Sequence, residues 1–176
     1  LMVVRETDGT RNILIATHDG QAICFDENDV RVMGRTAVGV RGIRLKEGDY
    51  VVGAARATPG KAVLSITENG YGKRTAVEAY LRGEDRQPQT RGGKGLRNYR
   101  LTEKTGLVAG AAIVDDTNDV MLIESGGVVL RTPAASINLY GRDTQGVILM
   151  RIEEGNRVIG VEAISNTEET EESGED

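Results

Sequence analysis

The strongest constraint on the fold of this chain is a pattern that occurs three times along its 176 residues. Each copy has an apolar stretch, a short polar turn that ends in glycine, and a second stretch rich in β-branched or small residues. The copies read ILIATHDGQAICF from Ile13, VLSITENGYGKRT from Val63 and VMLIESGGVVLRT from Val120. This is the sequence form of a β-hairpin, since Asp-Gly and Asn-Gly pairs favour tight hairpin turns.

The agreement continues after each hairpin. From the hairpin glycine to the glycine of a second motif the spacing is 19, 25 and 19 residues, and a glycine in a closing strand follows 14, 15 and 14 residues later. The second motifs, here called the box segments, read GRTAVGVRGIRL from Gly34, QTRGGKGLRNYRL from Gln89 and GRDTQGVILMRI from Gly141. The one departure is an insertion around RGEDRQP in the middle copy, so the three copies indicate an internal repeat.

Each copy therefore reads as four short strands, and strands at such regular spacing with glycine-rich turns are typical of propeller-like arrays. No stretch shows the helical periodicity of a βαβ unit. We predict an all-β fold, a β-pinwheel or propeller-like array of about three four-stranded blades. The blades are expected at approximately 11–60, 61–117 and 118–164, followed by a disordered acidic tail at 165–176.

Composition supports a sheet core and a reducing compartment. There is no Trp and one Phe, so Val, Ile, Leu and Ala must form the core, and β-branched residues favour sheets. The single Cys24 excludes an intramolecular disulfide and a cysteine-based zinc site, and we expect it to be buried. No apolar run approaches the roughly 20 residues of a membrane span, and from the first residues given we expect no signal peptide. We expect a cytoplasmic protein.

Charge is sorted along the chain, although the net charge is only −5. The last twelve residues, SNTEETEESGED, hold six acidic residues and no cation, which leaves 21 acidic and 22 basic residues in the rest. Within that rest, residues 73–104 carry nine Lys or Arg against four Asp or Glu. A block of like charge with few apolar residues is expected to be disordered, and a basic middle suggests an anionic partner.

The stretch QTRGGKG, from Gln89 to Gly95, is the strongest candidate site. A nucleotide P-loop requires G-x-x-x-x-G-K-[ST], but Pro88 occupies the first glycine position and Gly95 follows Lys94, so this reading fails. Two readings remain from the residues alone: a solvated glycine-rich turn, or a loop that grips a nucleic-acid backbone. Glycines let backbone N–H groups approach an anion, Arg offers a planar fork and Lys a mobile charge.

Other cations extend this candidate surface. Lys73 and Arg74 leave the adjacent hairpin, and Arg97 and Arg100 follow the box. At the corresponding positions of the other copies lie Arg35, Arg41, Arg44, Arg142 and Arg151. A curved rim of cations would neutralise successive phosphates without reading bases. The alternative is that about half of these cations pair with carboxylates of their own blade; Arg35 and Arg142 are the preferred DNA ligands.

Two further groups are interpreted as inert. His18 is the only histidine and lies in the first hairpin turn, where we expect a surface residue without a catalytic role. Asp115, Asp116 and Asp119 lack the spacing of an EF-hand, so they predict an acidic loop rather than a metal site. We expect no metal and no cofactor in this chain.

With NGYGKRT, QTRGGKG and GRDTQGVILMRI in view, the chain resembles the C-terminal domain of bacterial DNA gyrase A over essentially its whole length. It is similar to the last three blades of that family's six-bladed β-pinwheel. The family's box is Q-R-R-G-G-K-G, which is matched by Gln89, Arg91, Gly92, Gly93, Lys94 and Gly95, while Thr90 replaces the first arginine. In the family the principal box belongs to the first blade, so QTRGGKG is read as a second, variant box.

The resemblance implies a function. Such a domain binds and wraps double-stranded DNA through phosphates, without sequence specificity, and supports ATP-dependent negative supercoiling by the whole type II topoisomerase. It implies Arg91, Lys94, Lys73 and Arg74 as phosphate ligands and Gly92, Gly93 and Gly95 as the residues that allow close approach. The family's catalytic tyrosine lies in another region, so no role in cleavage passes to Tyr50, Tyr71, Tyr80, Tyr99 or Tyr140.

The implied partners are DNA, the rest of gyrase A and the gyrase B protein, with ATP and Mg²⁺ bound elsewhere in the complex and a location at the bacterial nucleoid. The acidic tail is either a passive solubilising end or a competitor of DNA for the basic rim. Exposed blade edges also suggest a homodimer. Two alternatives are the related topoisomerase IV domain, which generally lacks an intact box, and a propeller-like protein-interaction module. An independent enzyme is disfavoured because no set of nucleophile, base and metal ligands is present.

Overall fold

The computed structural model describes residues 1–165 and confirms an all-β fold. The strands are β1 (Asn12–Thr17), β2 (Gln21–Asp26), β3 (Val51–Ala57), β4 (Ala62–Thr67), β5 (Tyr71–Ala76), β6 (Leu96–Arg97), β7 (Val108–Val114), β8 (Asn118–Glu124), β9 (Val129–Pro133), β10 (Val147–Ile148) and β11 (Val158–Ser165). Three short 3-10 helices follow the hairpins: η1 (Glu27–Asp29), η2 (Val77–Tyr80) and η3 (Ala134–Ser136). The acidic tail lies outside the described residues, except for Ser165 at the end of β11.

The predicted hairpins are present in all three copies. β1 pairs with β2, β4 with β5 and β8 with β9, each antiparallel. Each closing strand then pairs with the first strand of its hairpin, so β3 joins β1, β7 joins β4 and β11 joins β8. The left-handed backbone at Gly20 (φ 76°) and Gly70 (φ 81°) makes the tight turns, which explains why both turns end in glycine.

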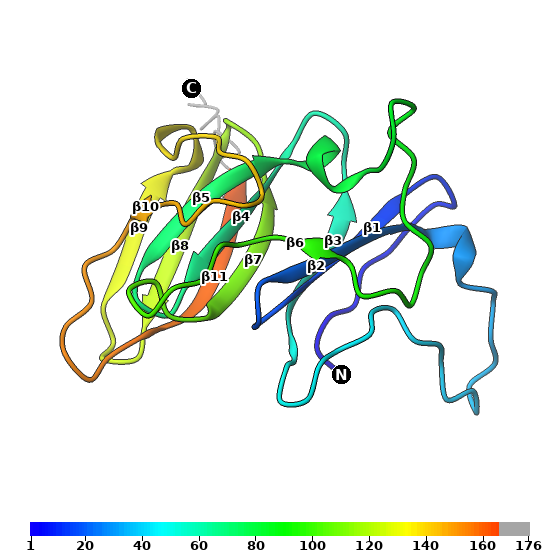
Figure 1. Cartoon of the computed structure of the whole chain (residues 1–176), viewed down its shortest axis with the longest axis horizontal. Helices are drawn as coiled ribbons and strands as arrows, with labels where there is room; N and C mark the ends of the chain where they lie inside the picture. Colours follow the sequence, from blue (N-terminus) through cyan, green and yellow to red (C-terminus); the bar gives the residue numbers. More distant parts are fainter. Residues whose placement is uncertain (166–176) are drawn as a thin grey trace, which may run out of the picture.

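The fourth strand of a sheet comes from the next copy of the repeat. β6, from the box segment at 89–101, pairs with β2, and β10, from the box segment at 141–152, pairs with β5. The sheet orders are β3-β1-β2-β6, β10-β5-β4-β7 and β11-β8-β9. Figure 1 shows the green β6 beside the blue β2. The expectation of four strands from one contiguous copy is therefore wrong, because the box strand completes the preceding sheet.

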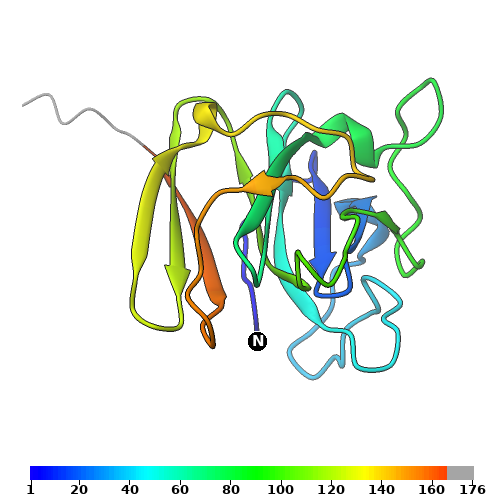
Figure 2. The ribbon, with the colours of Figure 1, turned by 60° about the vertical axis from the view of Figure 1, so that its left-hand side comes forward.

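The sheets pack face to face in chain order, as the turned view in Figure 2 shows. One core cluster lies between the first and second sheets and includes Leu14, Cys24 and Val63; the other lies between the second and third and includes Ile66 and Leu122. β4 is buried along its whole length, as a strand covered on both faces must be. Cys24 is fully buried, as predicted, and burial raises the pKa of its thiol to about 12.

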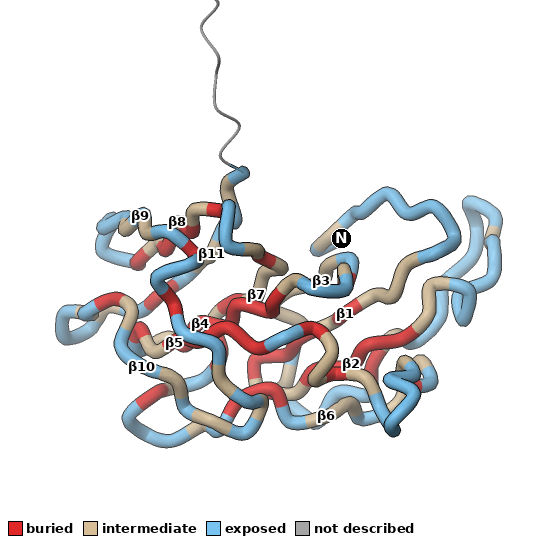
Figure 3. Tube along the Cα trace, turned by 90° about the horizontal axis from the view of Figure 1, so that it is seen from above, coloured by how far each residue is buried: buried red, intermediate tan, exposed pale blue. Residues whose placement is uncertain are grey.

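The inner and outer edges of the sheets differ in character. β3, β7 and β11 lie side by side on the inner edge, where small residues allow close approach: a Cβ added at Gly53 would lie 2.5 Å from the carbonyl oxygen of Ala111. β6 and β10 lie on the opposite edge, along one side of the molecule (Figure 3). In this arrangement the box segments form the outer edge; together the three segments are called the rim.

Candidate nucleic-acid interface

The box segment at 89–101 is docked firmly on the first sheet. Leu96 and Arg97 pair with Ala22 and Gln21, and the amide of Asn98 donates to Gly20 O at 2.7 Å. Gly95 has a φ of 76°, and a Cβ there would overlap the carbonyl oxygen of Ala22. A glycine is needed at this position because the two backbones touch, so Gly95 has a role in assembly of the sheet.

Gln89, the first residue of the box, is an anchor. It is buried, with its amide donating to Cys24 O at 2.7 Å and its side-chain Nε2 donating to Tyr80 O at 3.2 Å. The prediction that Gln89 contacts DNA is not compatible with this position. A glutamine is suited to this role because its amide can satisfy a backbone carbonyl inside the protein.

Arg91 and Lys94 occupy different environments. Arg91 is half-buried, and its guanidinium donates to two backbone carbonyls, from Nε to Asp29 O at 3.0 Å and from Nη1 to Arg41 O at 2.6 Å. Lys94 is exposed and lines a shallow hollow of about 200 Å³ with Arg44 and other residues. The geometry thus makes Lys94 the more accessible cation for a phosphate, while Arg91 has partners within the protein.

The two central glycines also serve the contact with the preceding box segment. The amide of Gly92 donates to Gly42 O at 2.7 Å, and Gly93 O accepts from the amide of Arg44 at 2.8 Å. Gly92 adopts a φ of 80°. Because its amide is already bonded, Gly92 does not offer the free N–H group that the phosphate-cradle hypothesis requires.

Lys73 is fully buried, so the prediction that it extends the positive surface is wrong. Its Nζ donates to the carbonyl oxygens of Gly141 (2.9 Å), Arg142 and Thr144 (3.1 Å) and to the Thr144 hydroxyl (3.1 Å). It also lies 4.7 Å from the centre of the Tyr99 ring. Burial lowers the pKa of Lys73 to about 7, against the opposing charge of Asp143. Lys73 therefore holds the third box segment on the second sheet.

Arg74 is also buried and does not continue an exposed track. Its Nε donates to Ile137 O, and its Nη1 forms an ion pair with Asp116. Two neighbouring cations in the sequence are thus both internal, because β5 lies under the third box segment and η3. Along a strand with one solvent-facing side, neighbouring residues alternate between buried and exposed. This alternation does not apply to β5, because both of its faces are covered.

Arg97, Arg100 and Arg142 meet where the second and third box segments touch. The guanidinium groups of Arg97 and Arg100, whose side chains are 59% and 57% exposed, lie 3.1 and 3.3 Å from the same oxygen of Asp143. These hydrogen bonds, first from Arg100 and then from Arg97, hold the pKa of Asp143 below its ordinary value. Arg142 is half-buried and donates to Arg97 O at 2.8 Å.

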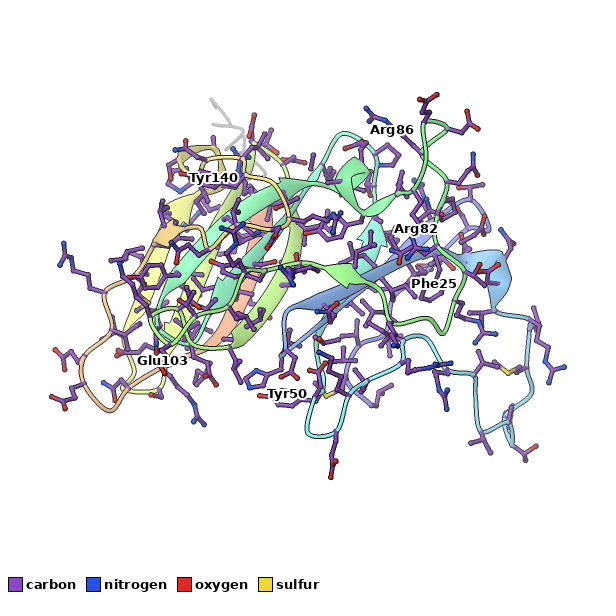
Figure 4. All side chains as sticks on the ribbon, viewed as in Figure 1. Phe25, Tyr50, Arg82, Arg86, Glu103 and Tyr140 are labelled. Atoms are coloured by element: carbon purple, nitrogen blue, oxygen red, sulfur yellow. The ribbon has the colours of Figure 1, made fainter. Side chains whose placement is uncertain are left out.

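The remaining rim cations are exposed. Arg35 lies in the first box segment and is exposed, as predicted. Arg44, Arg100 and Arg151 occupy one equivalent position, five residues after the glycines at 39, 95 and 146, and all three are exposed. Both this position and that of Arg35 and Arg142 carry arginine in all three copies, so the repeat alone does not show which of the two is exposed. Figure 4 shows Arg82 and Arg86 on the projecting insertion, which Arg82 and Gln87 close through two backbone hydrogen bonds.

The other candidate groups have structural roles. His18 is buried, stacks on Tyr50 at 4.4 Å between ring centres and has its Nδ1 2.8 Å from Val108 O, so the expectation of a surface histidine is wrong. Asp115 pairs with Lys61 at 2.9 Å. Within residues 1–165, no group of three His, Cys, Asp or Glu side chains is placed to hold a metal, and no helix is long and apolar enough to cross a membrane.

These features define a class: an array of antiparallel sheets that are completed by strand exchange and bear basic loops on the outer edge. The sequence matches the family described as DNA gyrase C-terminal domain, beta-propeller, at residues 11–58, 61–83, 86–115 and 118–165. The chain belongs to this family.

Among curated relatives, it is 40% identical to DNA gyrase A of Escherichia coli strain K12 over 172 residues, which is 98% of this chain and 19% of the relative. It is 41% identical to DNA gyrase A of Staphylococcus aureus strain MRSA252 over 178 residues, which is 100% of this chain and 19% of the relative. The chain thus spans about a fifth of the length of these relatives.

Solved structures agree with the fold. The gyrase A C-terminal domain has a TM-score of 0.79 at 26% identity, with 90% of this chain and 52% of that chain covered. The C-terminal domain of DNA topoisomerase IV has a TM-score of 0.81 at 27% identity, with 90% of this chain and 48% of that chain covered. The backbone is therefore common to both domains, and the sequence relatives carry the assignment to gyrase A.

Proposed function

We propose that this chain binds double-stranded DNA along the rim, through phosphates and without sequence specificity, and bends the duplex around it. The observation that carries the proposal is the recurrence of one exposed arginine, at positions 44, 100 and 151, in consecutive box segments. Lys94 adds a further exposed cation between the first two of them. Cations at repeated positions on a curved edge suit a duplex, whose phosphates repeat along its length.

The energetic requirement favours several box segments acting together. Bending roughly 20–30 base pairs by 40–90° costs on the order of 1–6 kcal/mol. A single exposed ion pair contributes about 0–1 kcal/mol in water, so one loop does not offset this cost. Contacts from three consecutive segments together offset the cost of bending more readily. Each phosphate contact adds roughly 0.9 to the negative slope of log affinity against log salt.

In the whole protein, this domain is proposed to be a non-catalytic part of DNA gyrase that wraps DNA and supports ATP-dependent negative supercoiling in the bacterial cytoplasm, at the nucleoid. Its partners would be the rest of gyrase A and the gyrase B protein, and ATP and Mg²⁺ would bind in those other parts. The contacts of the two buried tyrosines support a structural role for them and not a catalytic one. The Tyr80 hydroxyl donates to Asn98 Oδ1, and the Tyr99 hydroxyl donates to Gln145 O at 2.8 Å.

The test is a salt-titrated binding assay on a duplex of random sequence. Replacing Arg44 and Arg151 with alanine should lower the affinity about tenfold or more and reduce the salt slope by about 2. The matched control replaces two exposed arginines of the inner edge, Arg56 in β3 and Arg5, which lines the same pocket, with the same loss of charge. Equal losses in both pairs, or a loss for one DNA sequence alone, would contradict rim binding. A complete lack of salt-sensitive affinity would favour a protein-interaction module.

A second copy is proposed as a partner through free sheet edges. β9 has no strand beyond it in the described residues, and Val128 and Val129 are 53% and 54% exposed. The first box segment at 34–45 forms no strand and joins no sheet there, although its equivalents form β6 and β10. Donation of this segment to β9 of a second copy would repeat the exchange seen twice within the chain. Sedimentation that shows only monomers at high concentration would contradict it.

A further inference from the structure

The three box segments share an arginine at the same place. Arg35, Arg91 and Arg142 each lie four residues before the glycine at which the segment meets a sheet, at Gly39, Gly95 and Gly146. The resemblance to the family treats this arginine as a phosphate ligand. The described contacts give it another role at both junctions where two box segments touch.

The guanidinium reaches back to the preceding box segment in both cases. Nη1 of Arg91 donates to Arg41 O at 2.6 Å, and Nη1 of Arg142 donates to Arg97 O at 2.8 Å. The acceptors are themselves equivalent, because Arg41 and Arg97 each lie two residues after the box glycine. A contact that recurs at equivalent donor and acceptor positions is a property of the repeat and not an accident of one surface loop.

A backbone hydrogen bond accompanies the arginine at each junction. The amide of Arg44 donates to Gly93 O at 2.8 Å, and the amide of Arg100 donates to Thr144 O at 3.1 Å. These pairs are also equivalent between the two junctions. One guanidinium bond and one amide bond between successive box segments therefore recur at both junctions, beside further bonds that differ between them, and the rim is a continuous series of bonded loops.

The guanidinium groups of Arg91 and Arg142 donate to neutral backbone carbonyls, while the Asp29 carboxylate accepts from the backbone amide of Arg91 at 3.3 Å. The charge of these guanidinium groups is not cancelled by a carbonyl oxygen, whereas Arg97 and Arg100 share the carboxylate of Asp143. The planar fork of arginine has five donors in fixed directions, so it can hold a carbonyl while its other N–H groups face outward. A lysine would keep the charge without this directed contact.

We propose that Arg91 and Arg142 are positioning residues, clamps that fix the distance between successive box segments. The clamped residues, Arg41 and Arg97, are themselves exposed cations, so each clamp fixes the backbone that carries a rim charge. The consequence for DNA rests on the proposed function: clamped cations hold a bent duplex at several points at once. Contact with a single box segment does not depend on the clamp.

The test uses the double variant Arg91→Lys and Arg142→Lys, which keeps the net charge. Amide hydrogen exchange at Arg44 and Arg100 should accelerate about tenfold, the factor expected for loss of a charge-assisted hydrogen bond at the junction. Lys94→Arg, a change of the same type at an exposed cation of the same segment, is the matched control and should leave both rates unchanged. Circular dichroism confirms that the variants retain the sheets. Unchanged exchange in the double variant would overturn the clamp.

DNA binding separates the clamp from the proposed function. For a duplex of about 10 base pairs, one helical turn, the double variant should bind as the original chain does. For a duplex of about 30 base pairs it should bind about tenfold more weakly and bend the DNA less, as measured by energy transfer between its ends. An equal loss on both duplexes would assign Arg91 and Arg142 to direct phosphate contact and overturn their role in spacing. Accelerated exchange without DNA binding by any variant would overturn the proposed function and leave the clamp in place.

Discussion

The two exchange junctions of this molecule have the same backbone and different side chains. At the first, β6 lies on β2, and Asn98 N donates to Gly20 O; at the second, β10 lies on β5, and Leu149 N donates to Gly70 O. Beneath the box segment, the first junction has the buried, apolar Ile23, while the equivalent residue of the second is the buried Lys73.

The comparison shows which contacts are common to both junctions and which are particular to one. The close approach of Gly95 to Ala22 O at the first junction recurs between Gly146 and Gly72 O at the second. The side chain underneath is variable. The first junction has the apolar Ile23, which lies 3.8 Å from the position of a Cβ added at Gly93, and the second has the Nζ of Lys73, which donates to three carbonyls and a hydroxyl. Strand exchange is thus specified by glycines, and each junction is then stabilised by its own chemistry.

The largest expected effect is on the shared backbone contact. Gly95→Ala and Gly146→Ala should each lower the free energy of unfolding by about 3 kcal/mol or more, because the new Cβ overlaps a carbonyl oxygen and φ is positive. The equivalent Gly39 has a φ of 93° but no atom within 4 Å of an added Cβ, so Gly39→Ala should cost only about 1 kcal/mol. Urea unfolding measures all three, and equal losses would show that contact at the junction is unimportant.

The next effect separates the two junctions. Lys73→Met should lower the free energy of unfolding by about 2–3 kcal/mol, because the hydrogen bonds of the buried Nζ to Gly141, Arg142 and Thr144 are lost. Ile23→Met at the equivalent position keeps an apolar side chain of similar volume and should cost less than about 1.5 kcal/mol. Thermal or urea unfolding gives the comparison. A Lys73→Met variant as stable as the original chain would mean that the ammonium group does not hold β10.

A smaller effect is a dependence on pH at the second junction alone. Burial lowers the pKa of Lys73 from 10.5 to about 7, so between these values the unfolded chain binds more protons at this residue than the folded chain. The contribution of Lys73 to the free energy of unfolding should therefore rise as pH increases from 7 to 8.5, by about 1–2 kcal/mol. Urea unfolding at both pH values measures the rise, which should be absent in Lys73→Met. A rise of the same size in that variant would assign the pH dependence to other groups.

The smallest effect concerns charge. Asp143 accepts from Arg97 and Arg100 at the second junction, while its equivalent at the first junction is the uncharged Gly92. Asp143→Asn should free both guanidinium groups and raise the affinity for duplex DNA about two- to fivefold at low salt, the scale of an exposed ion pair. Fluorescence anisotropy measures the affinity, with Asp8→Asn, at a carboxylate paired with Arg11, as the control. A lower affinity in Asp143→Asn would show that the carboxylate organises the cations for binding.

Sequence reasoning predicted the local elements well. The hairpins around Gly20 and Gly70 and the closing strands follow from turn chemistry and repeated spacing, and these are signals within a short stretch of chain. The repeat also identified the box segments as a distinct motif. It did not identify the sheet that each box strand joins, because two residues of β6 pair with a strand about 75 residues earlier, and such pairing leaves no periodic pattern.

The site was predicted less well, for a related reason. Lys73, Arg74 and Gln89 are polar residues whose burial depends on what covers them, namely η3 and the exchanged segments. A charged residue is usually exposed, so its residue type alone predicts exposure. This prediction fails where a distant loop covers the charged group and supplies acceptors for its hydrogen bonds. Arg91 shows an intermediate case, since it is only half-buried but its partners at Asp29 and Arg41 come from the preceding copy.

The exchange of strands also gives the array a direction. The first sheet needs β6 from the second copy and the second sheet needs β10 from the third, whereas within residues 1–165 neither later sheet borrows a strand from an earlier copy. Local unfolding of the third copy would therefore remove an edge strand from the second sheet, while local unfolding of the first copy would leave the strand pairing of the other two sheets complete. Unfolding should therefore spread from one sheet to the preceding sheet, toward the amino terminus, more readily than to the following sheet.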